Sequence, residues 1–300
     1  MTDPILKAVE ILKKGGLVAF PTETVYGLGA DATQEKAVQS IFRVKGRPEN
    51  HPLIVHLHEA AQLKDWAREV PKDAALLSQK FWPGPLTLIL KKSKSVLDVV
   101  TGHQDTVGLR VPDHPLALRL LREFGKGVAA PSANRFGRVS PTSADHVRVD
   151  LGADVDYILD GGICAVGVES TIVDFSSGEP VILRPGGLTR ERIEAALNRS
   201  VVLRSSSAVR VSGQLESHYA PRARVVLVEP GEASARAAEL RQSGQRVVAL
   251  GAAETEAQEL YASLRRADES GADVIVVPLP AEVGLGLAVA DRLRKAAGPR

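Results

Sequence analysis

The sequence predicts an α/β protein built from two sheets, because short apolar runs alternate with helix-like segments along all 300 residues. Up to about residue 200 the alternation is irregular, which predicts a twisted mixed sheet surrounded by helices. After residue 222 it becomes regular, which predicts a small parallel sheet wrapped by helices. The stretch between them is rich in Ser, Gly and Pro and has no periodicity, as linkers do. We therefore predict domains at 1–203 and 223–300, joined by a linker at 204–222.

The first region begins with a helix whose two ends are both marked. Asp3 can cap it, Pro4 occupies its first turn, and Gly15 and Gly16 follow its last turn. Apolar runs then predict strands at 17–20, 53–58, 86–90, 107–111, 127–130, 156–160, 170–175 and 181–184. Periodic segments predict further helices at 33–44, 59–68, 73–81, 115–124 and 189–197. The segment PTETVYGLGAD at 21–31 is predicted as a polar loop after the first strand.

In the second region three predicted strands alternate with three predicted helices. The strands are 224–229, 246–250 and 273–279, and the helices are 232–242, 255–266 and 285–296. Strands joined through helices in this way run parallel. A G-x-G begins at residue 284, but it lacks the third glycine of a dinucleotide-binding motif and follows the last strand. We therefore expect it only to pack a helix against the sheet.

Composition excludes several classes of protein. Basic and acidic residues nearly balance, at 38 and 36, so the chain lacks the charge of a tight nucleic-acid binder. The single cysteine, Cys164, excludes an intrachain disulfide framework and a multi-cysteine metal site, and His56 and His58 have no nearby third ligand. No apolar run approaches the roughly 18–20 residues of a membrane helix, and no signal-peptide core is present. We expect a cytoplasmic protein with no membrane partner and no protein-bound metal.

Polar and cationic side chains gather in the loops at the ends of the predicted strands of the first region. Such loops meet in the ligand crevice of an α/β fold, and guanidinium and hydroxyl groups suit phosphate oxygens. Arg110 lies inside an apolar strand, where it must find an anionic partner or reach solvent. Taken one at a time these segments have plainer explanations: Lys45 and Arg47 could simply compensate a helix dipole. No P-loop and no G-x-S-x-G motif is present.

Together these segments resemble the YrdC/Sua5 family. The resemblance is carried, in order along residues 5–197, by FPTETVYGLGA, the K-x-R of Lys45 and Arg47, NHPLIVH, FWPGPLT, GLRVP, the S-x-N of Ser132 and Asn134, ESTIVD and ILRPG. The linker sequence QLESHYAP and the three-unit α/β tail resemble the long Sua5 form of the family. The resemblance implies a YrdC-like domain with helices around a basic crevice, followed by a Rossmann-like C-terminal domain.

The activity that the resemblance implies is synthesis of L-threonylcarbamoyladenylate. L-Threonine, bicarbonate and ATP would give threonylcarbamoyl-AMP and pyrophosphate, in the first step of t6A modification at position 37 of tRNA. ATP would be a substrate, with Mg²⁺ on its triphosphate and no metal ligated by the protein. The implied partners are the proteins that transfer the threonylcarbamoyl group to tRNA, together with weak RNA binding at most.

The resemblance also implies roles for particular residues. Threonine would be held by Thr24, His56, Arg110, the backbone near Ala130, and Ser170. ATP would be held by Lys45, Arg47, His51, Thr106, Ser132, Asn134, Ser140 and Arg184, with Tyr219 closing over it. Of these, Lys45, Arg47, Ser132 and Asn134 would be the catalytic group. His51 stands where the family most often has Asn, and His218 and Tyr219 belong to a segment expected to act as a lid.

Two other functions are compatible with such a crevice. The first is an RNA-binding module, which the modest charge excess argues against because RNA affinity depends on clustered cations. The second is a carbamoyl transferase of the kind used in hydrogenase maturation. Those chains add acylphosphatase-like and cysteine-rich zinc segments, and a chain with one cysteine has no room for the latter.

Overall fold

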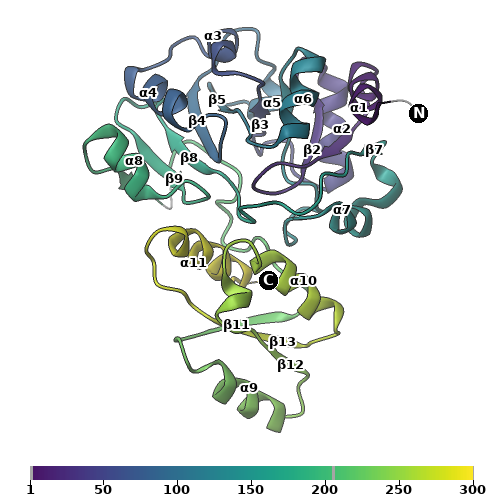
Figure 1. Cartoon of the computed structure of the whole chain (residues 1–300), viewed down its shortest axis with the longest axis vertical. Coiled ribbons are helices and arrows are strands. Elements are labelled where there is room, and N and C mark those ends of the chain that lie inside the picture. The colour runs from purple at the N-terminus through teal and green to yellow at the C-terminus, as the bar shows by residue number, and fades with distance from the viewer. Residues whose placement is uncertain (1–2, 205–206, 300) are drawn as a thin grey trace.

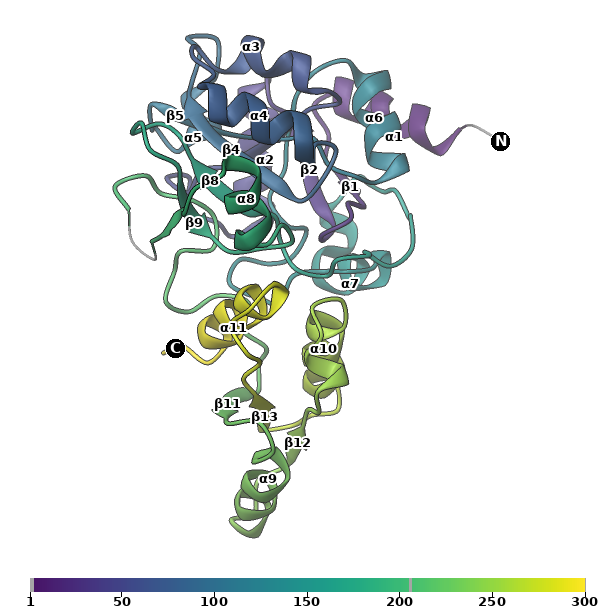
Figure 2. The same cartoon turned by 60° about the vertical axis from the view of Figure 1, so that its left-hand side comes forward.

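The computed structural model describes residues 3–204 and 207–299, which form two sheets. Residues 1, 2, 205, 206 and 300, which fall at the ends of the predicted domains and in the predicted linker, lie outside the described residues. Figure 1 shows the larger sheet with its helices above the smaller one, and Figure 2 shows the same two layers from the side. We call residues 3–203 the N-terminal part and residues 223–299 the C-terminal part.

Ten described strands form the larger sheet, in the order β10-β9-β8-β4-β5-β3-β6-β2-β1-β7. Their bounds are Val18–Phe20 (β1), Gly27–Asp31 (β2), Ile54–His56 (β3), Leu86–Lys91 (β4), Thr106–Arg110 (β5), Val128–Ala129 (β6), Tyr157–Ile158 (β7), Thr171–Asp174 (β8), Val181–Arg184 (β9) and Val202–Leu203 (β10). Parallel and antiparallel pairs both occur, since β3 runs parallel to β5 and antiparallel to β6. The predicted mixed sheet is confirmed.

Helices surround this sheet. They are Pro4–Lys13 (α1), Glu35–Lys45 (α2), Leu63–Trp66 (α3), Lys72–Phe81 (α4), Asp98–Thr101 (α5), Pro115–Phe124 (α6), Ala144–Leu151 (α7) and Arg190–Leu197 (α8). The expected cap of α1 forms, because the Asp3 carboxylate accepts a hydrogen bond of 2.9 Å from the backbone N–H of Ile5. Among the described residues, no helix combines the length and the apolar character needed to cross a membrane.

The second half of the predicted polar loop at 21–31 is a strand, β2. Its glycines allow the sheet to close tightly, because a Cβ at Gly29 would lie 2.8 Å from atoms of Phe20 and Val128. The loop prediction followed the polar residues Thr22 to Thr24 and overlooked the apolar alternation that follows them. The predicted polar loop is therefore confined to the first half of this segment.

The helices differ from the prediction in four main places, one of which is the short α5, which was not predicted. The segment predicted as a helix at 59–68 contains only a 3₁₀ turn and the short α3. α7 was not predicted, although Ser143 caps it by accepting a hydrogen bond from the backbone N–H of His146. The helix predicted from residue 255 begins at Leu260, because Thr255 ends a preceding 3₁₀ turn and donates its hydroxyl to the carbonyls of Gly251 and Ala252 just before that turn.

The C-terminal part confirms the predicted parallel sheet. Its strands lie in the order β11-β13-β12 and have the bounds Arg224–Val228 (β11), Val247–Ala249 (β12) and Val274–Pro278 (β13). Its helices are Ala233–Gln242 (α9), Leu260–Glu269 (α10) and Leu285–Ala296 (α11). Both cartoon views place α10 and α11 between this sheet and the N-terminal part, and α9 at the far end (Figures 1 and 2).

The two parts share a hydrophobic core. Val139 and Val168 of the N-terminal part pack in one buried cluster with Leu260 and Tyr261 of α10. Tyr219, which belongs to the segment between the two parts, lies in the same cluster. Removal of this apolar surface from water stabilises the contact. The C-terminal part is therefore packed against residues that neighbour the polar loops of the larger sheet.

Candidate active site

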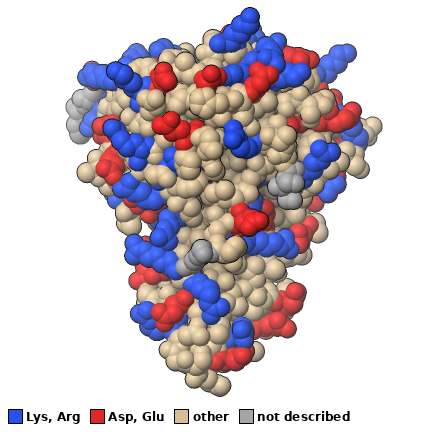
Figure 3. Space-filling view, turned by 180° about the vertical axis from the view of Figure 1, so that it is seen from behind, with Lys and Arg blue, Asp and Glu red and all other residues tan. Residues whose placement is uncertain are grey.

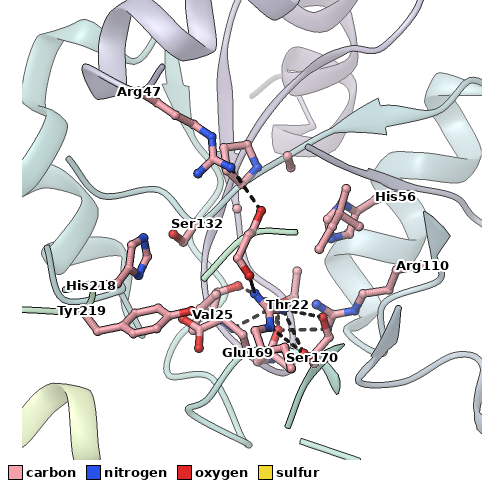
Figure 4. Close-up of a pocket in the computed structure, with 17 residues that line it drawn as sticks. Thr22, Val25, Arg47, His56, Arg110, Ser132, Glu169, Ser170, His218 and Tyr219 are labelled. Carbon is pink, nitrogen blue, oxygen red and sulfur yellow. Dashed lines mark hydrogen bonds between the residues drawn. The ribbon is translucent and has the colours of Figure 1, made fainter. Parts of the chain in front are cut away.

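A small cavity of about 50 Å³ lies where strand ends and loops of the larger sheet meet the segment 207–222 (Figure 4). The strands β3 and β5 bring His56 and Arg110 to it as register partners on adjacent parallel strands. The sequence-predicted residues that line it are Thr24, Arg47, His56, Arg110, Ala130, Ser132, Ser170, Arg184 and Tyr219. The structure thus gathers most of the predicted site residues, from eight separate loops and strands, around one cavity.

The other predicted residues, Lys45, His51, Thr106, Asn134 and Ser140, lie outside the lining of this cavity. Lys45 is buried and donates its ammonium to the carbonyl of Ser132 at 2.6 Å and to the carbonyl of Asn134. Burial, together with Arg47, lowers the pKa of Lys45 well below its usual range. These contacts make Lys45 a support for the backbone of the loop that carries Ser132.

Four residues of this group remain, and among them Asn134 donates its side-chain amide to the carbonyls of Arg135 and Arg138, both at 2.8 Å. The Ser140 hydroxyl donates to Glu169 Oε1 at 2.6 Å, and Glu169 does line the cavity. The half-buried His51 ring meets the Phe136 ring edge-on, with centroids 5.3 Å apart. Thr106 lies at the start of β5, in a separate small pocket. The roles predicted for these residues stay predictions.

Two of the buried guanidinium groups at the cavity have only neutral partners. Arg47 donates to the carbonyl of Pro52 at 2.9 Å and to the Ser212 hydroxyl at 3.2 Å. Arg184 donates to the carbonyls of Ser170 and Ser212, at 2.8 and 3.1 Å. Neither forms a direct ion pair with a carboxylate of the described residues, although the charge of Glu169 acts on Arg184 and favours its charged form. A buried charge without a paired counter-charge is costly. Burial, with Arg184 nearby, lowers the pKa of Arg47 to about 10, so it stays charged at neutral pH.

Arg110 is compensated instead. Its Nη2 lies 2.7 Å from Glu23 Oε1 and donates to the Thr24 hydroxyl at 2.9 Å, while its Nε donates to the carbonyl of Gly84 at 3.3 Å. Both members of the ion pair are buried. The anionic partner that an arginine inside an apolar strand requires is therefore Glu23.

Two neutral imidazoles complete the lining. Burial lowers the pKa of His56 and that of His218 to about 3, so both rings are uncharged at neutral pH. The Nδ1 atom of each is buried without a hydrogen-bond partner among the described residues. Figure 4 shows the two rings on opposite sides of the cavity. Since buried polar atoms are normally paired, each ring has a free site for a ligand atom.

Some lining residues were not predicted from the sequence: Thr22, Glu169 and Ser212. Thr22 builds its loop, donating its hydroxyl to the carbonyl of Val25 at 2.6 Å. Glu169 directly precedes the predicted Ser170, so a carboxylate beside a proposed substrate contact was the available signal. Nothing in the linker composition distinguishes Ser212 from the other serines around it.

Comparison with known proteins agrees with this geometry. The Sua5/YciO/YrdC family model, described as "Telomere recombination", matches residues 10–186, and one described as "Threonylcarbamoyl-AMP synthase, C-terminal domain" matches residues 188–298. The threonylcarbamoyl-AMP synthase of Pyrococcus abyssi is 43% identical, over 98% of this chain and 94% of that protein. The enzyme of the same name from Bacillus subtilis is 42% identical, over 99% and 94%. The chain belongs to the Sua5/YciO/YrdC family.

Among solved structures of this family, P. abyssi Sua5 complexed with L-threonine matches with a TM-score of 0.92. The two proteins are 42% identical, and the match covers 98% of this chain and 94% of the other. Because it includes the C-terminal part, the chain has the two-part arrangement of the long Sua5 form. The C-terminal family model begins before α8, so it also includes β10 and the segment between the two parts.

Proposed function

We propose that this protein is a threonylcarbamoyl-AMP synthase. It forms threonylcarbamoyl-AMP and pyrophosphate from L-threonine, bicarbonate and ATP, as the first step of t6A modification at position 37 of tRNA. The observation that carries the proposal is a cavity with two buried guanidiniums that form no direct ion pair with a carboxylate of the described residues, Arg47 and Arg184, in a chain 43% identical to a synthase over almost its whole length. A cavity of this kind suits a triphosphate.

The wall formed by β3 and β5 is proposed to hold L-threonine. Arg110 offers a guanidinium to the α-carboxylate, a pairing that can be bidentate. Thr24, His56 and Ser170 offer hydroxyl and imidazole groups to the amine and the side-chain hydroxyl, and the backbone near Ala130 completes this wall. A site built to bond a hydroxyl rejects analogues that lack it.

The opposite wall is proposed to hold ATP. We propose that Arg47 and Arg184 bind phosphate oxygens and that Ser132, which lines the same cavity, also contacts ATP. Lys45 and Asn134 are proposed to act through the backbone of the loop that carries Ser132, because Lys45 donates to the carbonyls of Ser132 and Asn134. His51, Thr106 and Ser140 are proposed to contact ATP from outside the cavity lining. Mg²⁺ is proposed to accompany the triphosphate as part of the substrate.

The reaction needs positioning more than a nucleophile of the protein. Bicarbonate first loses hydroxide to give CO₂. The threonine amine then attacks the CO₂ carbon and forms a C–N bond, and the proton it releases combines with the hydroxide as water. A carbamate oxygen then attacks the α-phosphorus of ATP, the bond to the β-phosphate breaks, and pyrophosphate leaves with the electron pair. Negative charge grows on phosphate oxygens in this step, so fixed guanidiniums such as Arg47 stabilise its transition state.

The segment 207–222 is proposed to act as a lid. A cavity of about 50 Å³ holds a few water molecules and is far smaller than ATP. Ser212 accepts a hydrogen bond from one nitrogen of Arg47 and from one nitrogen of Arg184, and the buried Tyr219 and His218 line the same cavity. ATP must therefore displace Ser212 on entry, and the lid then shields the reactive adenylate from water.

We further propose the domain boundaries 1–203, 204–222 and 223–300, a cytoplasmic location, and transfer of the product to tRNA by partner proteins. A primary role in binding RNA is not favoured by the surface. On the face shown in Figure 3, basic and acidic side chains are interspersed. Several exposed arginines, such as Arg148 and Arg246, are also paired with aspartates. Clustered, unpaired cations are what RNA affinity requires.

A pyrophosphate-release assay tests the proposed function. The purified chain is supplied with L-threonine, bicarbonate and ATP, and each is omitted in turn. We expect release only when all three are present, and formation of threonylcarbamoyl-AMP in equal amount. Release that does not depend on threonine, or release with carbamoyl phosphate in place of threonine and bicarbonate, would contradict the proposal and favour the carbamoyl-transferase alternative.

A further inference from the structure

The cavity floor contains a carboxylate whose partners come mainly from the C-terminal part. Glu169 Oε2 accepts a hydrogen bond of 2.6 Å from Arg292 Nε of α11, and Tyr261 of α10 donates its hydroxyl to the same oxygen at 2.8 Å. Only Ser140, at 2.6 Å from Oε1, comes from the N-terminal part. Glu169 lines the cavity and directly precedes Ser170.

Arg292 also contacts the lid. Its guanidinium carbon lies 5.0 Å from the centroid of the Tyr219 ring, which is a cation–π contact. Tyr219 is buried, has a φ of +59°, and stacks on Tyr261 at a centroid distance of 5.8 Å. A tyrosine in the left-handed region keeps that conformation only when its surroundings fix it. Arg292 is thus a direct contact of both Glu169 on the floor and Tyr219 in the lid.

These contacts hold a charge that the cavity could not otherwise keep. Burial alone would raise the pKa of Glu169, but Arg292 and Arg184 outweigh it and lower this pKa to about 2. The carboxylate is therefore ionised, and it borders a space lined by Arg47 and Arg184. Arg292, whose side chain has no exposed surface, also donates to the carbonyl of Pro185 at 3.0 Å, beside Arg184.

We propose that Arg292 is a positioning residue for the ATP side of this site, holding Glu169 and Tyr219 in the places from which they shape the cavity. It does not itself line the cavity. Without it, Glu169 is a buried carboxylate that lacks its ion-pair partner and is free to seek Arg184, and Tyr219 loses its cationic support. The C-terminal part would then contribute to the reaction through the side chain of Arg292, with Tyr261 contacting the same two residues. The proposal rests on the proposed function.

The structure offers a matched control. Arg265 of α10 is also a buried arginine of the C-terminal part, and it forms an ion pair with Asp150 of α7 and donates to the carbonyl of Val139. Its Nε also donates to the backbone carbonyl of Ser140 at 3.5 Å, but among the described residues it forms no hydrogen bond or ion pair with a residue that lines the cavity. Arg265→Gln therefore weakens the same interface to a similar degree and leaves the Glu169 and Tyr219 contacts in place.

The kinetic test compares full-length Arg292→Gln, Arg265→Gln and Glu169→Gln/Arg292→Gln with the wild type. We expect Arg292→Gln to raise KM for ATP and to lower kcat/KM for ATP by about 10- to 100-fold, as loss of a supporting contact around a site does. KM for L-threonine should change much less. Arg265→Gln should keep the wild-type KM for ATP, and the double variant should recover part of the loss, because no unpaired carboxylate remains. A merely destabilised enzyme would lose kcat through its folded fraction and keep its KM.

Limited proteolysis gives a readout that does not depend on activity. Trypsin should cut the segment around Arg210 faster in Arg292→Gln than in the wild type and in Arg265→Gln, because the lid has lost its contact with α11. If Arg292→Gln does not fold, Arg292→Lys, which keeps the charge without the planar fork, should show the same changes to a smaller extent.

Equal KM values for ATP and equal cleavage rates in wild type and variant would overturn the proposal, as would an equal loss in Arg265→Gln. A wild-type chain that needs no threonine to release pyrophosphate would instead contradict the proposed function, and the proteolysis comparison would still test the contact.

Discussion

The cavity and the interface with the C-terminal part both bury arginines, but the two regions treat the charges differently. At the cavity, Arg47 and Arg184 donate only to carbonyl and hydroxyl groups. At the interface, Arg265 and Arg292 are each paired with a carboxylate. Since unpaired buried charge is unfavourable, the interface arginines need no further partner, whereas Arg47 and Arg184 can still pair with an anionic ligand. The comparison separates a binding site from a structural contact made of the same residue type.

Arg110 lines the cavity, but it is paired with a carboxylate as the interface arginines are. Its replacement should therefore have the largest effect on stability. Replacing it in Arg110→Ala leaves Glu23 buried without its partner, which should lower the free energy of unfolding by about 3–5 kcal/mol. Urea unfolding followed by circular dichroism measures this. The double variant Glu23→Gln/Arg110→Ala should recover much of the loss, and failure to recover any would show that the pair does not matter.

Arg47→Ala should behave in the opposite way. It removes a charge that has no counter-charge, so the free energy of unfolding should stay at or above the wild-type value. Pyrophosphate release should fall by about 100-fold or more, because the transition state loses a fixed cation. Steady-state rates and urea unfolding of the same preparation check both statements. A variant that is strongly destabilised, or that keeps near wild-type turnover, would contradict the contrast between the two regions.

The neutral imidazoles of His56 and His218 predict a smaller effect, which is a dependence of the free energy of unfolding on pH. His56 and His218 have folded-state pKa values of about 3 against about 6.5 in an unfolded chain, so below pH 6.5 only the unfolded state takes up protons. The contribution of these two rings to the free energy of unfolding is therefore fully present above pH 6.5. It falls on acidification by about 1.4 kcal/mol per pH unit for each imidazole. Unfolding measured between pH 7 and pH 5 tests this, and His218→Gln should reduce the slope by one such increment. An unchanged slope would mean that His218 titrates normally in the folded protein.

Much of this structure follows from local sequence signals. Caps and apolar periodicity place α1, α6, α11 and both sheets, because those features act within a few residues. Residue types at strand ends also predict which side chains meet at the cavity. The partners of those side chains could not be predicted in the same way. Glu23 for Arg110, Ser212 for Arg47 and Arg292 for Glu169 are pairings between distant segments, which only the three-dimensional arrangement brings together.

Lys45 shows most clearly which contacts a sequence pattern does not reveal. The K-x-R pattern places Lys45 and Arg47 two residues apart, and both were predicted to hold ATP. In the structure only Arg47 lines the cavity, while Lys45 holds the backbone at Ser132 and Asn134. Left-handed Gly46 between them turns the chain, so neighbouring cations point to different partners.

A crystal structure of the full chain with L-threonine and a non-hydrolysable ATP analogue tests the central claim most directly. The uncompensated guanidiniums predict that phosphate oxygens lie within hydrogen-bond distance of Arg47 and Arg184, with Ser212 displaced from both. Density for the triphosphate elsewhere, with the contact between Arg47 and Ser212 intact, would contradict it.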